Sequence, residues 1–156
     1  NVAAGAGPYC TSPHMGRGAA RADLDDDGDI DLVVSHLNEP VAVLANETDT
    51  DNHWLVLRLI GTRSNRQAIG ARVRIETADG PQTRQLTGGG SYASTNDPRM
   101  FFGLGSTDLV DEIQIDWPSG TQQTLGPVTG DRLLSVVEPG EGISDQQATQ
   151  SSFDAP

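Results

Sequence analysis

The stretch Asp23-Leu24-Asp25-Asp26-Asp27-Gly28-Asp29-Ile30-Asp31 decides how the rest of the chain is organised. It places six carboxylates in nine residues, and a glycine within it permits a sharp turn. Calcium takes six to eight oxygen ligands, which such a loop can supply from alternate side chains and a backbone carbonyl. The cation also removes the repulsion between the carboxylates. An ordinary acidic surface loop would not require carboxylates that alternate in this way around a glycine. The predicted calcium ligands are Asp23, Asp25, Asp27, Asp29 and Asp31.

The residues on either side of the loop indicate strands rather than the helices of an EF-hand. An EF-hand needs a bidentate Glu at its twelfth loop position, which here falls on Val34. Apolar side chains alternate along residues 30–34, and residues 17–22 form the pattern of a short strand that enters the loop. The expected element is therefore strand, calcium loop, strand. Magnesium suits it less, because that ion seldom uses a cage made only of protein ligands.

The overall composition excludes several classes of partner. The formal net charge is −12, and all ten basic residues are arginine. Such a surface repels nucleic acid and anionic lipid, so neither partner is expected. No run of 18 apolar residues is present, so we expect no membrane insertion. Eighteen glycines and nine prolines indicate many turns between short elements.

The cysteine content and the calcium loop bear on where the protein acts. Cys10 is the single cysteine, so no internal disulfide can form. A weak calcium site would stay empty in the cytosol, whereas extracellular modules bind calcium at roughly 10⁻⁴–10⁻³ M. We therefore expect an extracellular or cell-surface location. The opening residue, Asn1, fits either a mature terminus after cleavage or the cut edge of a longer protein.

From His53 onward the pattern changes to longer strands. Residues 53–60 are nearly continuously apolar, which predicts a central strand buried on both faces. Further strands follow at spacings of about 8–12 residues, separated by glycine- and proline-containing turns. We therefore expect an all-β protein, in which a calcium-loop strand pair resembling a lone propeller blade leads into an antiparallel β-sandwich with extended termini. The expected segments are an arm over 1–16, the calcium element over 17–46, a linker over 47–52, the β-sandwich over 53–138 and a flexible or partner-docking tail over 139–156.

The other chemically interesting residues do not assemble into a catalytic set. The three histidines are scattered without a nucleophile beside them, so we expect no enzymatic activity. Cys10 and His14 are too few ligands for zinc. Trp54 and Trp117 lie in apolar or inward-facing strand positions, so we expect both in the core rather than at a ligand. The arginines expected to pair with carboxylates across strands, rather than to form a basic stripe, are Arg58, Arg72, Arg74 and Arg84.

Two parts of the chain resemble known families. Residues 17–34, with the acidic loop, resemble one FG-GAP repeat (also named VCBS), the calcium-binding blade of integrin-type propellers. Residues 53–138 resemble the ASPIC/UnbV domain. The marks that carry this second resemblance are His53-Trp54-Leu55, Ile69-Gly70-Ala71-Arg72-Val73, Gly88-Gly89-Gly90-Ser91-Tyr92, Gly103-Leu104-Gly105 and Trp117-Pro118-Ser119-Gly120. The first resemblance implies that the side chains of four aspartates bind calcium, with the carbonyl of Asp29 as a further ligand: Asp23, Asp25, Asp27 and Asp31.

Two functions follow as expectations. A single blade cannot bury its faces or hide its strand edges, so the first is a calcium-stabilised extracellular structural or adhesion protein. It would self-assemble through its exposed strands and termini, with other copies or another extracellular protein or glycan as partner. The alternative is a carbohydrate- or protein-binding module at the C-terminus of a larger secreted propeller protein.

Overall fold

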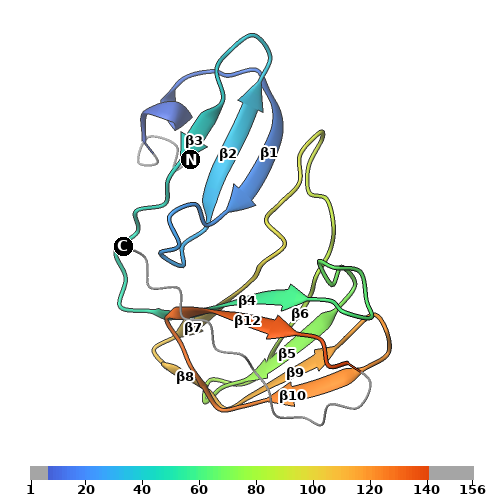
Figure 1. The fold of residues 1–156 in the computed structure, drawn as a ribbon. Coiled ribbons are helices and arrows are strands. Elements are labelled where there is room, and N and C mark those ends of the chain that lie inside the picture. The colour runs from blue at the N-terminus through green and yellow to red at the C-terminus, as the bar shows by residue number, and fades with distance from the viewer. Residues whose placement is uncertain (1–6, 141–156) are drawn as a thin grey trace.

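We describe the protein from a computed structural model, which defines residues 7–140. Within this range the chain forms strands and one short 3₁₀ turn, η2 (Pro8–Thr11), and contains no α-helix. Figure 1 shows a small N-terminal sheet at one end of the molecule and a larger β-domain at the other. The all-β prediction is therefore confirmed. Within the described part of the chain there is also no helix long and apolar enough to cross a membrane.

The small sheet carries the acidic stretch between its first two strands. It consists of β1 (Gly16–Ala22), β2 (Asp31–His36) and β3 (Ala42–Leu44), with β2 in the middle and both pairings antiparallel. The alternation of apolar and polar residues after the loop produced the predicted strand, because residues two apart share one face of a strand. Residues 23–30 are therefore the connection from β1 to β2. The predicted order of strand, loop and strand is confirmed.

The β-domain is built from two main sheets and a two-stranded ribbon around one hydrophobic core. β4 is the middle strand of one sheet, which accounts for its nearly continuous apolar sequence. Its side chains at Leu55, Val56 and Leu57 are almost completely buried. The strand orders are β12-β4-β7, β10-β9-β5-β6 and β11-β8. The strands are β4 (His53–Ile60), β5 (Arg72–Glu76), β6 (Gln82–Gln85), β7 (Met100–Gly105), β8 (Leu109–Val110), β9 (Glu112–Asp116), β10 (Gln122–Leu125), β11 (Val128–Thr129) and β12 (Arg132–Val137).

The direction of one strand differs from the expected antiparallel sandwich. β12 runs parallel to β4, with Arg132 opposite Leu55 and Val137 opposite Ile60. The other strand pairs in the described residues are antiparallel. β4 and β12 are the first and last strands of this domain, so the whole intervening chain serves as the crossover that a parallel pair requires. Hydrophobic periodicity in the sequence identifies a strand. It does not show which distant strand pairs with it, or whether the two run parallel.

A long connection from the domain lies against the small sheet. Residues 86–99 link β6 to β7 and extend beside β1 (Figure 1). The hydroxyl of Ser94 donates to the carbonyl oxygen of Ala19 at 2.9 Å, and the Asp97 N–H donates to the carbonyl of Arg21 at 3.0 Å. Gly18 is necessary at this contact, because a Cβ there would lie 2.5 Å from the carbonyl oxygen of Tyr92. Backbone-level contacts therefore hold the two regions together.

The predicted terminal segments are only partly described. Within the arm, Tyr9 stacks on the ring of His14 at 4.3 Å between centroids, and its hydroxyl is 2.7 Å from Nε2 of His36. His14 also pairs with Glu39 at 2.8 Å. These contacts place residues 9–14 on the turn between β2 and β3. Most of the predicted tail, residues 141–156, lies outside the described residues.

Candidate metal centre

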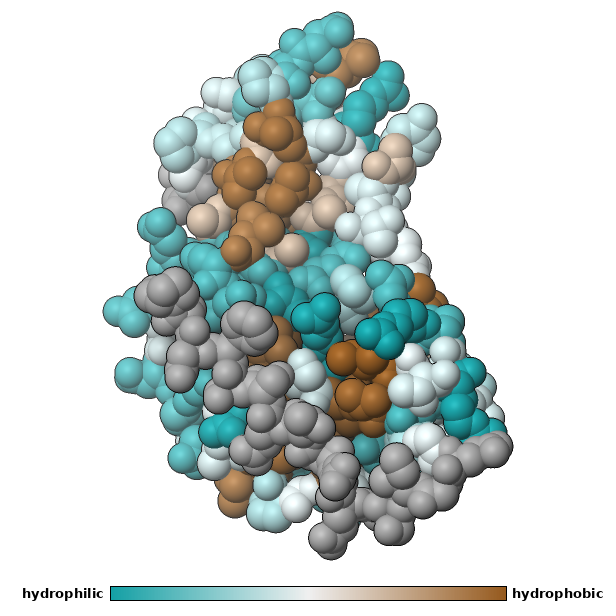
Figure 2. All heavy atoms as spheres, in the orientation of Figure 1, coloured by the Kyte–Doolittle hydropathy of each residue, from teal (hydrophilic) through white to brown (hydrophobic). Residues whose placement is uncertain are grey.

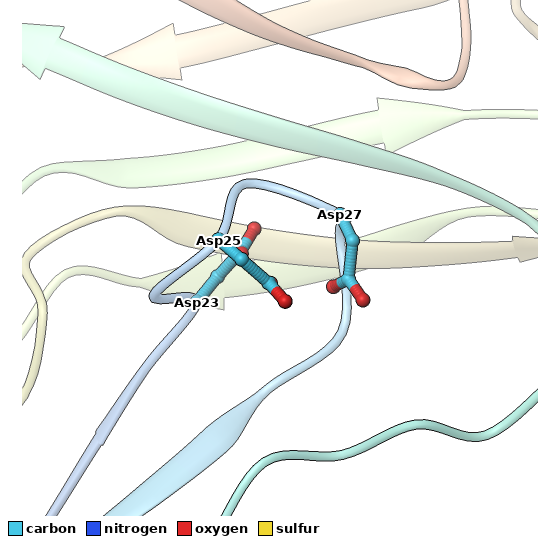
Figure 3. Close-up of side chains that lie close together, drawn as sticks. All are labelled: Asp23, Asp25 and Asp27. Carbon is cyan, nitrogen blue, oxygen red and sulfur yellow. The ribbon is translucent and has the colours of Figure 1, made fainter.

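Three of the predicted ligands come together in the loop between β1 and β2. Carboxylate oxygens of Asp23, Asp25 and Asp27 all lie within 4.8 Å of one another. Figure 3 shows the three side chains on one side of the turn, with Asp23 and Asp25 close to each other and Asp27 facing them. Asp23 is buried, whereas Asp25 and Asp27 are exposed. The loop thus presents an all-oxygen donor set with one side open to solvent.

The buried member of this set has an unsatisfied oxygen. Oδ2 of Asp23 accepts a hydrogen bond from the Gly28 N–H at 3.1 Å, but its buried Oδ1 has no partner among the described residues. Burial raises the pKa of the Asp23 carboxyl above its usual 3.8, although the Gly28 N–H and the Arg99 guanidinium act in the opposite direction. A buried carboxylate oxygen without a partner carries a large desolvation cost. A hard cation between the three carboxylates would satisfy it, so these residues fit calcium.

The remaining predicted ligands have different positions. Asp31 is buried, and its two oxygens accept the N–H groups of Leu24 and Asn46, each at 2.8 Å. It therefore fixes both ends of the loop, although each oxygen retains a second lone pair. Asp29 donates its N–H to Asp27 at 2.8 Å. Burial and then the neighbouring carboxylates, beginning with Asp27, raise its pKa. That accumulation of negative charge is what a bound cation would compensate.

The turn of the loop depends on a close contact with the β-domain. Gly28 has a φ of 96°, and a Cβ at this position would lie 2.1 Å from the indole of Trp54. Trp54 is half-buried on β4, and its indole lies against Gly28 of the loop. The expectation that Trp54 belongs to the core is therefore wrong, because this ring covers the acidic turn instead. Trp117 is a core residue as expected, and its Nε1 donates to Gln123 at 3.0 Å.

Arg99 connects the loop to the β-domain and was not predicted from the sequence. Its guanidinium donates to Oδ1 of Asp26 at 2.5 Å, to Oδ2 of Asp97 at 2.6 Å and to the carbonyl of Asp23. Asp26, with a φ of 60°, thus turns away from the cluster and engages the arginine. An arginine 68 or more residues from the loop in sequence carries no local signal of this role. Only the fold brings it within reach of these oxygens.

A third buried carboxylate, Glu138, lies in the β-domain. Glu138, just after β12, accepts N–H groups from Thr62, Arg63 and Ser64 at 2.9, 2.8 and 2.7 Å. The hydroxyls of Ser64 and Ser119 also donate to it. Burial alone would raise the pKa of Glu138, but the bonds from Ser119 and from the loop lower it to about 2. This site is filled by the protein's own anion and is structural.

The arginines on the sheet surface divide into paired and unpaired residues. Arg74 pairs with Glu76, and Arg72 lies opposite Asp116 in the register of β5 and β9. Glu76 lies on the same strand as Arg74, so this ion pair runs along β5 and is not the expected pairing across strands. The expected pairing is also wrong for Arg84, whose guanidinium lies over the ring of Phe102 at 5.4 Å and contacts no carboxylate within residues 7–140. Cys10 is exposed and free.

Comparison with known proteins agrees with the C-terminal resemblance. The family model described as "ASPIC and UnbV" matches residues 61–143. Cartilage acidic protein 1 is 32% identical in the human sequence over 128 residues and in the Xenopus tropicalis sequence over 133 residues. These matches cover 79% and 81% of this chain but only 19% and 20% of the two relatives. The chain thus spans about a fifth of the length of those relatives, and the family match begins directly after β4 and includes the later strands of the β-domain. The chain belongs to the ASPIC and UnbV family.

Proposed function

We propose that this chain is a calcium-stabilised structural or adhesion module of the extracellular space. The observation that carries the proposal is the unpartnered, buried Oδ1 of Asp23 beside two further carboxylates within 4.8 Å. In this proposal Asp23, Asp25 and Asp27 hold calcium through their side chains, and Asp29 and Asp31 complete the ligand set. Bound calcium would supply the positive charge that this loop lacks.

The chain's own residues prepare the loop for that role. Asp31 fixes its ends through two backbone N–H groups, Trp54 covers Gly28, and Arg99 holds the outer side of the turn. These contacts restrict the loop before the cation arrives, which lowers the ordering cost of binding. Calcium binding to the folded state then stabilises the junction between the small sheet and the domain by mass action.

The extracellular assignment rests on the chemistry of the site and on the relatives. A site of three carboxylates, two of them exposed, suits the high calcium concentrations outside cells. The relatives named above carry cartilage, an extracellular tissue, in their names. The acidic surface, with a net charge of −12, also favours divalent cations over nucleic acid or anionic lipid.

Self-assembly through the small sheet is the second part of the proposal. β3 is an edge strand of that sheet, and edge strands offer unpaired backbone groups to a further strand. Figure 2 shows hydrophobic residues gathered over this end of the molecule. The exposed apolar side chains of residues 15–43 are Met15, Leu24, Leu32, Leu37, Val41 and Val43. A second copy or another extracellular protein would cover them.

Thermal unfolding with calcium and with EDTA tests the metal site. We expect calcium to raise the melting temperature, with about 2.7 kcal/mol of stabilisation at a hundred times the dissociation constant. Asp25→Asn should remove this increase and leave the melting temperature in EDTA close to that of the parent chain. Asp49→Asn makes the same charge change at an exposed position outside the loop and is the control. An Asp25→Asn variant that still responds fully to calcium would contradict the ligand role.

Light scattering on the same samples tests the assembly. Particles larger than the chain that disperse in EDTA would support calcium-dependent self-association. A chain that scatters as a monomer at every concentration, with and without calcium, would remove the assembly part and leave the calcium module. Calcium binding and self-assembly are therefore tested independently of each other.

The alternative role as a binding module is favoured by a different observation. Trp117 is buried and Trp54 is half-buried against Gly28, so neither indole is an open platform for a sugar or peptide. A polar pocket lies instead between the small sheet and the domain, lined by Arg21, Arg84 and Arg99 among others. A ligand of the module would bind there.

A further inference from the structure

The pocket at the junction of the two regions has a distinctive lining. It encloses about 230 Å³ between the end of β1, the strand β6 and the segment that leads into β7. Arg21, Arg84 and Arg99 line it together with the amide of Asn96 and the half-buried ring of Phe101. Three of the chain's ten arginines therefore lie in one pocket of a protein with a net charge of −12.

The carboxylate in this lining does not neutralise the three arginines. Oδ1 of Asp97 accepts the backbone N–H of Arg99 at 2.8 Å, and its Oδ2 accepts Nε of the same residue at 2.6 Å. Asp97 thus accounts for the charge of Arg99, to which Asp26 also contributes. It is the one acidic residue among the described residues that line the pocket. No carboxylate of the described residues 7–140 forms an ion pair with the other two arginines.

Arg21 and Arg84 are exposed, and contacts restrain the backbone of the first and the side chain of the second. Neither guanidinium forms an ion pair or a side-chain hydrogen bond within residues 7–140. The backbone of Arg21 is fixed by Asn96 Oδ1 at 3.1 Å and by the Asp97 N–H at 3.0 Å. Arg84 lies over the face of Phe102, which restricts its side chain. Each guanidinium keeps five N–H donors for an anionic ligand.

The donors of the pocket indicate the ligand. Guanidinium groups match the geometry of carboxylates and bind them in bidentate fashion. The pocket is smaller than the roughly 300–1,000 Å³ of a drug-sized site, so it suits a single ring rather than an extended peptide. Asn96 and Thr87 offer amide and hydroxyl groups, which can hydrogen-bond to the hydroxyls of a sugar ring. Phe101 offers an apolar surface, which suits the carbon-rich face of such a ring.

We propose that this pocket binds a sugar that carries a carboxylate, with Arg21 and Arg84 as the groups that recognise the acid. The inference rests on the binding-module role and is independent of the calcium ligands. The sugar acid could come as a free monosaccharide or as the terminal unit of an acidic glycan, which share this chemistry. The pocket adjoins the acidic loop, because Ile30 lines it and Arg99 bonds both Asp97 and Asp26.

Titration calorimetry with a small panel of ligands tests the proposal. The panel contains glucuronate, galacturonate and N-acetylneuraminate, with glucose as the sugar without charge and acetate as the charge without sugar. A glucuronate-terminated disaccharide separates the free sugar from the glycan terminus. We expect at least one sugar acid to bind at least about tenfold more tightly than glucose or acetate. No binding by any sugar acid at up to about 10 mM, or equal binding of acetate, would overturn the proposal.

Variants connect the binding to the pocket. Arg84→Gln and Arg21→Gln should each weaken the sugar acid by about tenfold or more, because each removes a charged donor. Arg58→Gln is the matched control, since Arg58 is exposed on β4 and outside the pocket. Unchanged affinity in both pocket variants, with unchanged melting temperatures, would overturn the proposal. The titrations are repeated with Asp25→Asn in EDTA, where retained binding shows that the pocket works even if the calcium proposal fails.

Discussion

The small sheet and the β-domain of this chain bury different kinds of side chain. Within residues 7–140, every buried hydrophobic side chain lies between Leu55 and Val136, in the β-domain. In the small sheet the buried carboxylates are Asp23 and Asp31, whereas the apolar side chain of Val43 is 57% exposed. The β-domain removes mainly apolar surface from water, with Glu138 as its buried carboxylate, whereas the small sheet and its loop remove carboxylates from water and leave apolar side chains exposed.

This difference predicts how each region responds to its surroundings. Apolar burial is non-directional and does not depend on a particular ion. A buried carboxylate is stable only with hydrogen bonds or a cation, so the small sheet should respond to calcium and to single polar contacts. The contact of Trp54 with Gly28 and the bonds of Arg99 join the two kinds of region.

The largest expected effect is in the hydrophobic core. Ile115→Ala on β9, at a position 1% exposed, should destabilise the domain by about 2–5 kcal/mol through the lost contacts and the cavity left behind. Chemical denaturation measures this loss. Val43→Ala in the small sheet is the matched truncation and should have little effect. Equal losses at both positions would break the contrast between the two regions.

The next effect concerns Glu138 and has a defined dependence on pH. Its folded-state pKa of about 2 is below the ordinary 4.5, so the ionised form stabilises the fold above pH 4.5. This contribution, about 3 kcal/mol at neutral pH, is lost as the pH falls from 4.5 through 2. Glu138→Gln should lower stability at pH 7 and flatten the acid limb of the stability curve between these values. A steep acid limb that survives the substitution would assign it to other carboxylates.

A smaller effect is expected at the joint between the regions. In Gly28→Ala the alanine would adopt a positive φ, and its Cβ would clash with the indole of Trp54. In Gly80→Ala the alanine would also adopt a positive φ, of 107°, but its Cβ would have no neighbour within 4 Å. Backbone strain alone costs about 1–2 kcal/mol and should appear in both variants. Only Gly28→Ala should also change the tryptophan fluorescence and weaken calcium binding. Similar behaviour of the two variants would show that the contact with Trp54 does not position the loop.

The smallest effect on stability is expected on the edge strand of the small sheet. Val43→Lys replaces an exposed apolar side chain on β3, so stability should change by no more than about 0.5 kcal/mol. A lysine on an edge strand discourages pairing with a further strand. Self-association, measured by light scattering, should decrease if the chain assembles through this edge. Assemblies of unchanged size would place the contact elsewhere.

Much of the architecture could be read from local patterns. The alternation after the acidic loop identified β2, and the continuous apolar run 53–60 identified the central strand β4. The alternating carboxylates identified Asp23, Asp25 and Asp27 as a cluster, which the fold brings together. These predictions succeed because strand periodicity and loop chemistry depend on residues a few positions apart.

The sequence by itself determined the strand content, the acidic loop and the net charge, since these are properties of neighbouring residues. Tertiary structure alone decided the parallel return of β12 onto β4, the placement of Trp54 on Gly28 and the reach of Arg99 to Asp26. It also left Arg21 and Arg84 together in one pocket. Each of these pairs is separated by many residues, and the contact depends on how whole sheets pack. Local periodicity carries no information about such distances, so these features became visible only in the folded chain.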